Sequence, residues 1–133
     1  MANAIYPKYK EALLDAFTDI DINMLTAKVA LIDTGTYTYS DTHDFFNDVT
    51  GVVGTPQTLT SKSVTNGVFD AADVTFTSVT GNSVEALLIY IDTGTASTSR
   101  LVAYIDTGVT GLPVTPNGGD ITITWNVSGI FAL

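Results

Sequence analysis

The sequence contains no cysteine, one histidine and only five basic residues among 133. Without cysteine the chain forms no disulfide and no thiolate metal site, so its stability must come from packing or from assembly with other chains. Binding to nucleic acid requires clustered Lys and Arg to neutralise phosphates, whereas the formal net charge here is −9. These shortages exclude a disulfide-stapled domain and argue against a nucleic-acid partner.

Long apolar runs are also missing. No run reaches the roughly 18 apolar residues that would span a bilayer. The opening residues, MANAIYPKYK, contain no apolar signal core. We therefore expect a chain that is made and folded in a cytoplasm and that has no membrane partner.

Small polar residues and glycine make up the rest of the composition. Hydrophobic residues account for 45% of the chain and charged residues for only 14%. The remainder is rich in Thr, Ser, Gly and Asn, which are typical of strand surfaces and turns. The length suits one core. We predict an all-β chain with an N-terminal arm and helix, residues 1–22, followed by a β-sandwich, residues 23–133.

The stretch from Val84 to Asp106, VEALLIYIDTGTASTSRLVAYID, predicts a central β-hairpin. Residues 84–91 and 100–105 are two nearly unbroken apolar runs of strand length, and the segment DTGTASTS between them is small and polar. This pattern favours two strands joined by a surface loop over one long helix. Since neither run has a polar face, we expect cover on both sides, from a second sheet and from a helix or another subunit.

Residues 7–17 predict one amphipathic helix. Four apolar side chains recur there at helical spacing: Tyr6, Tyr9, Leu13 and Phe17. Pro7 suits the first helical turn because its missing N–H has no helical partner at that position. The helix either closes an open face of the sandwich or acts as an arm that docks on a partner chain.

Alternating or branched apolar residues predict the remaining strands. We assign them to residues 25–31, 37–39, 58–64, 74–77, 121–127 and 130–133. Residues 43–46 predict a short helix at one end of the core, and residues 48–57 predict a loop. Together these elements predict a jelly-roll-like antiparallel β-sandwich of about eight strands with a short N-terminal helix.

The triplet Asp-Thr-Gly occurs three times, beginning at Asp33, Asp92 and Asp106. In aspartic proteases such a triplet supplies one carboxylate of the catalytic dyad, whose two carboxylates lie about 3 Å apart and share a proton. Asp92 and Asp106 end the two antiparallel strands of the hairpin, which separates them by about 20 Å at about 3.3 Å per residue. We therefore interpret the triplets as turns. An aspartic-protease-like enzyme using Asp33 with a symmetry mate remains the alternative, although Thr36 stands where that family has a small residue.

The other candidate residues do not form a recognisable chemical site. His43 has no partner motif, and Trp125 falls on the inward side of its strand. The chain has no nucleophile elbow, phosphate loop or calcium loop of spaced carboxylates. We predict no catalytic residue, no cofactor and no metal site, and therefore a protein that is not an enzyme.

Four stretches that span nearly the whole chain carry a family resemblance. They are MANAIYPKYKEALL; ALIDTGTYTYS with the following His43 and Phe45-Phe46; LTSKSVTNGVFDAADVTFTSVTG; and LIYIDTG…RLVAYIDTG…GLPVTPNGGDITITW. Together they resemble a group of small structural proteins encoded by tailed bacteriophages. The resemblance implies a capsid decoration, or cement, protein that is made in the cytoplasm of a host bacterium. It then lies on the virion surface, where it binds the major capsid protein in a completed head lattice. The alternative is a tail or receptor-binding module that recognises the host.

The N-terminal segment, residues 1–14, contains most of the capsid contacts that we predict. Lys8 and Lys10 flank Tyr6 and Tyr9, and aromatic anchors of this kind are enriched in protein interfaces. Lys62, on a predicted edge strand, is a secondary contact. We expect burial of the tyrosines to dominate, since surface salt bridges contribute under about 1 kcal/mol each. Decoration proteins commonly occupy symmetry axes, so the resemblance also implies a homo-oligomer, a trimer rather than a dimer.

Overall fold

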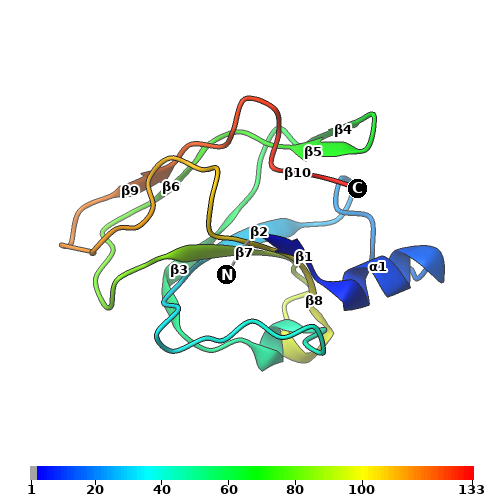
Figure 1. The fold of residues 1–133 in the computed structure, drawn as a ribbon, viewed down its shortest axis with the longest axis horizontal. Coiled ribbons are helices and arrows are strands. Elements are labelled where there is room, and N and C mark those ends of the chain that lie inside the picture. The colour runs from blue at the N-terminus through cyan, green and yellow to red at the C-terminus, as the bar shows by residue number, and fades with distance from the viewer. Residues whose placement is uncertain (1–2) are drawn as a thin grey trace.

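The computed structural model describes residues 3–133, and a five-stranded antiparallel sheet lies at its centre. The strand order in this sheet is β1-β8-β7-β2-β3. The strands are β1 (Ala4–Ile5), β2 (Ala27–Ile32), β3 (Val52–Thr58), β7 (Ala86–Ile91) and β8 (Arg100–Ile105). Figure 1 shows this sheet below a second layer of strands, with the helix α1 (Pro7–Leu14) at one end of the molecule.

The second layer consists of two smaller antiparallel sheets. One has the order β10-β5-β4 and the other pairs β6 with β9. Their bounds are β4 (Ser63–Thr65), β5 (Val68–Asp70), β6 (Val74–Phe76), β9 (Ile121–Ile123) and β10 (Phe131–Ala132). Large apolar side chains of this layer join the single core cluster. The predicted antiparallel β-sandwich is confirmed, with ten strands in residues 3–133 in place of about eight.

The predicted central hairpin is also confirmed. Every residue of β7 and β8 is buried. The two strands are antiparallel, with Leu87 opposite Ile105 at one end and Ile91 opposite Arg100 at the other. A strand that is buried on both faces does not alternate between apolar and polar residues, which explains the two nearly unbroken apolar runs.

Residues 33–51 cover the face of the central sheet that points away from the second layer (Figure 1). Phe46, in the short 3-10 helix η1 (Phe46–Asp48), stacks on Tyr90 with ring centroids 4.1 Å apart. Tyr39 packs on Tyr104 at 5.5 Å. The sequence predicts a helix or another subunit as this cover, but the cover is a mostly irregular segment of the same chain. The hairpin therefore needs no second subunit to be buried.

The predicted strand at residues 37–39 is wrong, because these residues belong to the irregular segment that covers the central sheet. Tyr37 and Tyr39 have the alternation of a strand, yet their backbone pairs with no strand within residues 3–133. Their rings instead pack over the central sheet, since Tyr37 is 2% exposed. Alternation alone does not separate a paired strand from an extended cover whose aromatic rings point inward.

The N-terminal helix is shorter than predicted, and a strand precedes it. α1 ends at Leu14, and Ala16 has a left-handed backbone with φ 54°. This turn removes Phe17 from the buried stripe and leaves its side chain 48% exposed. Before the helix, β1 pairs with β8, so the described part of the predicted arm, residues 1–22, begins as an edge strand of the central sheet.

Other boundaries also differ from the prediction; the predicted strand at residues 58–64, for example, is replaced by the end of β3 and the start of β4. The predicted loop at residues 48–57 contains β3, which pairs with β2 and accommodates Pro56 because no strand within residues 3–133 pairs with its other edge. The predicted strand at residues 121–127 ends early, and Asn126 forms a turn by accepting the N–H groups of Ser128 and Gly129. Trp125 is inward as predicted, and its ring N–H donates to the Ala72 carbonyl at 3.0 Å.

Candidate functional site

The first Asp-Thr-Gly triplet forms a turn after β2. Asp33 accepts the Gly35 N–H at 2.9 Å on one carboxylate oxygen, and the Thr36 hydroxyl at 2.9 Å and the Asn82 amide at 3.1 Å on the other. The bond from Gly35, followed by that from Thr36, lowers the pKa of Asp33 below its ordinary value. A carboxylate held in this way is ionised and oriented by the turn.

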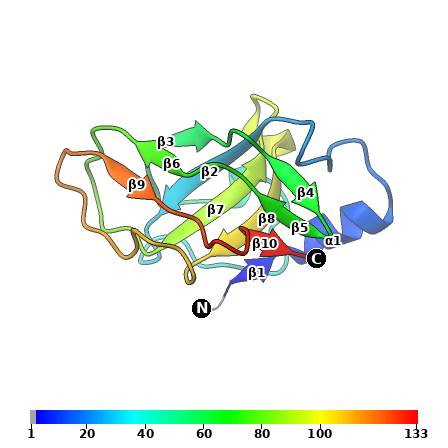
Figure 2. The same cartoon turned by 90° about the horizontal axis from the view of Figure 1, so that it is seen from above.

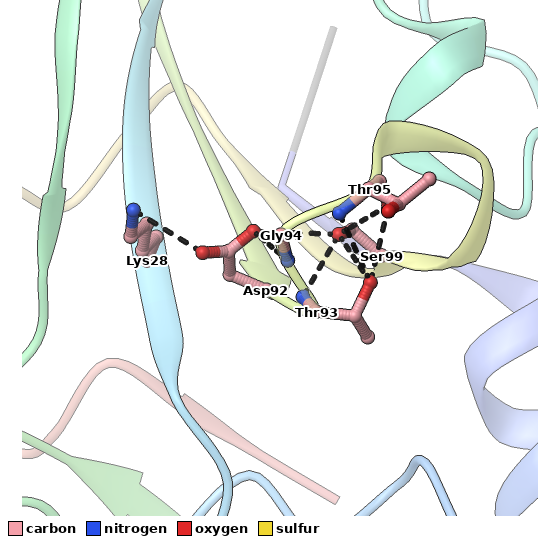
Figure 3. Close-up of polar contacts among 6 residues, drawn as sticks. All are labelled: Lys28, Asp92, Thr93, Gly94, Thr95 and Ser99. Carbon is pink, nitrogen blue, oxygen red and sulfur yellow. Dashed lines mark hydrogen bonds and ion pairs between the residues drawn. The ribbon is translucent and has the colours of Figure 1, made fainter.

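The second triplet forms a larger polar network after β7 (Figure 3). Asp92 accepts the Gly94 N–H at 3.1 Å, and its other oxygen lies 3.2 Å from the Lys28 ammonium. The Gly94 bond is the main cause that lowers the pKa of Asp92, and Lys28 adds to it. Ser99, which is 1% exposed, accepts the Thr93 N–H and donates to a main-chain carbonyl at 2.9 Å.

This network resembles a catalytic Ser-Lys-Asp group only in its residue types. The Ser99 hydroxyl is buried, and its acceptors are the Thr95 carbonyl at 2.9 Å and the Asp92 carboxylate at 3.4 Å, so it is not presented to a substrate as a nucleophile. Lys28 contacts Asp92 and not Ser99 among the interactions of residues 3–133. The network therefore fixes the loop between β7 and β8, including the 3-10 helix η2 (Ala96–Thr98).

The three triplets do not converge. Asp92 follows β7 at the end where Ile91 faces Arg100, whereas Asp106 follows β8 at the opposite end. The predicted separation of these two carboxylates therefore agrees with the strand register. Asp33 lies at the same end as Asp106, but β7 runs between their strands, which places the strands about 10 Å apart at about 4.8 Å per step. Within one chain this geometry does not form a carboxylate dyad.

Tyr6 and Tyr9, the predicted aromatic anchors, are core residues. Their side chains are 0% and 2% exposed. The Tyr6 N–H donates to the Val102 carbonyl at 2.9 Å, and the Tyr9 hydroxyl donates to the Ile20 carbonyl at 2.8 Å. The prediction that these tyrosines are buried against a partner is corrected, because β1 joins the central sheet and carries α1 onto it. Residues 1–2 of the predicted docking segment lie outside the described residues.

The three predicted contact lysines have different surroundings. The Lys62 ammonium donates to the main-chain carbonyls of Ile22 and Leu25, so it is engaged within the chain rather than displayed on an edge. Lys8 pairs with a neighbouring carboxylate on α1 at 3.0 Å and keeps 41% of its side chain exposed. Lys10 is exposed on the same helix. Of the predicted contacts, Lys8 and Lys10 remain on the surface.

A buried hydroxyl chain, which the sequence patterns did not reveal, links the N-terminal segment to the cover. The Tyr6 hydroxyl lies 2.8 Å from the Tyr37 hydroxyl, which lies 2.8 Å from Nδ1 of His43. Burial raises the pKa of Tyr6 far above its ordinary value, and burial also raises that of Tyr37. Both phenols are therefore neutral hydrogen-bonding groups. No periodicity could pair residues that lie this far apart in sequence.

A second link is built on Arg100, at the start of β8. Arg100 is 7% exposed, and its Nε and Nη2 atoms each lie 2.9 Å from one carboxylate oxygen of Asp19. Its guanidinium lies 4.8 Å from the ring centre of Phe45 and 5.4 Å from that of Phe17. Arg100 thus connects the segment after α1, the cover and the central sheet by ion pairing and cation–π contact.

Large apolar side chains are exposed close to α1 in sequence. Leu14 is 88% exposed, Met24 is 78% exposed and Phe17 is 48% exposed. All three lie in α1 or in the segment that joins it to β2, and α1 lies at one end of the molecule (Figure 1). These exposed apolar side chains are candidates for an interaction surface.

No family model matches this sequence, and no curated protein matches it significantly. In residues 3–133, no group of three or more His, Cys, Asp or Glu side chains is arranged to hold a metal ion. The same part of the chain has no helix long and apolar enough to cross a membrane.

Proposed function

We propose that this chain is a capsid decoration protein of a tailed bacteriophage, a non-enzymatic virion component that binds the major capsid protein and stabilises the head lattice. The resemblance of its sequence to small phage structural proteins motivates the class. The carboxylates of Asp33 and Asp92 are both engaged in turns, and this structural use of polar side chains supports the proposal. A clamp requires a stable body and an adhesive surface, and it requires no reactive group.

The observation that carries the proposal is the exposed apolar surface at the α1 end. We define the α1 surface as Lys8, Lys10, Leu14, Phe17 and Met24. Its apolar members supply area for burial. Exposed Glu11, Asp15 and Asp21 lie in the same part of the chain, and Lys8 is already paired with Glu11. A lattice patch with an apolar centre and a basic rim would complement this surface, since charges at a rim mainly provide specificity and association rate. This surface replaces the buried tyrosines as the docking element.

The test compares occupancy on purified heads that lack the protein. A Leu14→Ser, Met24→Ser double variant should bind fewer copies per capsomer than the wild type, because it removes exposed apolar area without disturbing the core. Val127→Ser is the matched control, since Val127 is fully exposed and lies outside the α1 surface. Equal occupancy for the double variant and the wild type would reject the α1 surface. Detection of the protein only at the tail tip would favour host recognition instead.

Copies per capsomer also report the assembly state. We propose a homo-oligomer, with a trimer favoured over a dimer, that forms on a symmetry axis of the lattice. The burial of the central hairpin within one chain means that the subunit does not need the oligomer for its core. Subunits can therefore remain separate in solution and associate on the head, which is why stoichiometry on particles is the informative measurement.

A further inference from the structure

One side of the sandwich is open between its two layers. β1 forms one edge of the central sheet, and β10 forms one edge of the small sheet above it. Figure 1 shows β10 in the upper layer and β1 in the lower layer, and Figure 2 shows both strands along the same side of the molecule. Within residues 3–133, no strand pairs with the second edge of either one. Each edge therefore presents backbone groups that another strand can bind.

Two cavities lie between these edges and form one cleft. Their volumes are about 370 Å³ and 250 Å³, and they share five lining residues. The shared residues are Asn3, Ile105, Ile130, Phe131 and Ala132. The layers of a sandwich normally fill this space with inward side chains from both sheets. Here β1 and β10 are both edge strands, and the space between them has room for the side chains of one more strand.

The lower edge of the cleft is held in place before any partner binds. The Asn3 side chain accepts the N–H groups of Asp106 and Thr107 at 2.6 and 3.0 Å and donates to the Thr107 carbonyl at 3.0 Å. These bonds fix the start of β1 against the end of β8. Fixing a binding edge in advance reduces the conformational entropy that association would otherwise cost.

The charge of the cleft restricts what can enter it. No lining residue of either cavity is ionisable except Tyr104, so a charged side chain buried there would lack a partner and would be costly. One acidic residue adjoins the lining, since Asp70 follows the residue that faces Phe131. The complementary segment is uncharged over its centre and carries Lys or Arg at the end beside Asp70.

We propose that this cleft binds an extended segment of a partner protein, which adds a strand to the free edge of β1 and places alternate small apolar side chains against Ile130 and Phe131. The backbone edge supplies main-chain hydrogen bonds and the cleft supplies side-chain selection, which is the mode of recognition by strand addition. This site is distinct from the α1 surface and does not depend on the proposed capsid role.

A random-peptide library selected against the full chain provides the test. Recovered peptides should share alternating small apolar residues with Lys or Arg at one end. They should also protect the amide of Ile5 from hydrogen exchange, because the neighbouring Tyr6 N–H donates to β8 and alternation therefore directs the Ile5 N–H to the free edge. Ala132→Trp fills the cleft and should weaken their binding by about tenfold or more. Ala96→Trp is the matched control, because Ala96 is also an exposed alanine but lies in η2; it should leave binding unchanged.

A second variant keeps the test decisive if Ala132→Trp disturbs β10. Ser128→Trp introduces the same side chain from an exposed lining residue outside the strand, and it should also weaken binding. Failure to enrich any peptide would overturn the proposal, as would equal binding by the two cleft variants and the Ala96→Trp control. Self-association of the chain that Ala132→Trp abolishes would identify a second copy as the occupant and would overturn the assignment to a partner.

Discussion

The hydroxyl chain from Tyr6 to His43 makes the stability of the whole sandwich sensitive to one oxygen atom. Replacing Tyr37 with Phe keeps the ring and removes the hydroxyl that lies 2.8 Å from both the Tyr6 hydroxyl and the His43 ring. Because Tyr6 is 0% exposed, its hydroxyl would lose a partner that water cannot readily replace. A buried polar group left unsatisfied costs about 1–3 kcal/mol.

Tyr6→Phe should cost less than Tyr37→Phe. After Tyr6→Phe the Tyr37 hydroxyl still has His43 as a partner, so the loss is that of one ordinary buried hydrogen bond, about 0.5–1.5 kcal/mol. The double variant removes both hydroxyl groups and leaves no orphan between them. We therefore expect its loss of stability to be smaller than the sum of the two single losses, as for directly interacting residues.

Urea unfolding followed by the fluorescence of Trp125, the single tryptophan, measures these differences. Calorimetry gives a second readout: at about 2.1 cal/mol/K per residue, a chain of 133 residues should lose about 3 to 4 °C of Tm per kcal/mol. A Tyr37→Phe protein with the midpoint of the wild type would refute the argument. Strict additivity in the double variant would show that the two hydroxyl groups are not coupled.

Two further predictions concern the charged links. Arg100→Lys keeps the charge but loses the planar fork and the ring contacts, so it should lower the free energy of unfolding by about 1–3 kcal/mol in urea titration, and an unchanged midpoint would contradict this role. The pKa of Asp33 is lowered in the fold, so its stabilisation is present above its unfolded pKa and is lost as pH falls through the folded value. Asp33→Asn should therefore flatten the fall in stability below about pH 4, and identical acid profiles would count against it.

The sequence by itself determined the class of fold and its centre. The two nearly unbroken apolar runs, residues 84–91 and 100–105, predict strands covered on both faces, because polar alternation is expected only where one face of a strand meets water. The inward position of Trp125 follows from the alternation of apolar and polar residues in 121–127. The turn role of the Asp-Thr-Gly triplets was also predictable from local chemistry for Asp33 and Asp92, since each carboxylate accepts the N–H group two residues later.

Tertiary structure decided which side chains are available to a partner. Helical spacing marked Tyr6, Tyr9 and Phe17 as one stripe, but it did not show that β1 would pair with β8 and bury the two tyrosines, or that the turn at Ala16 would expose Phe17. The spacing of apolar residues in the sequence indicates which residues share a face of one helix or strand. Burial depends on what the rest of the chain places against that face, and those contacts are made between segments far apart in sequence.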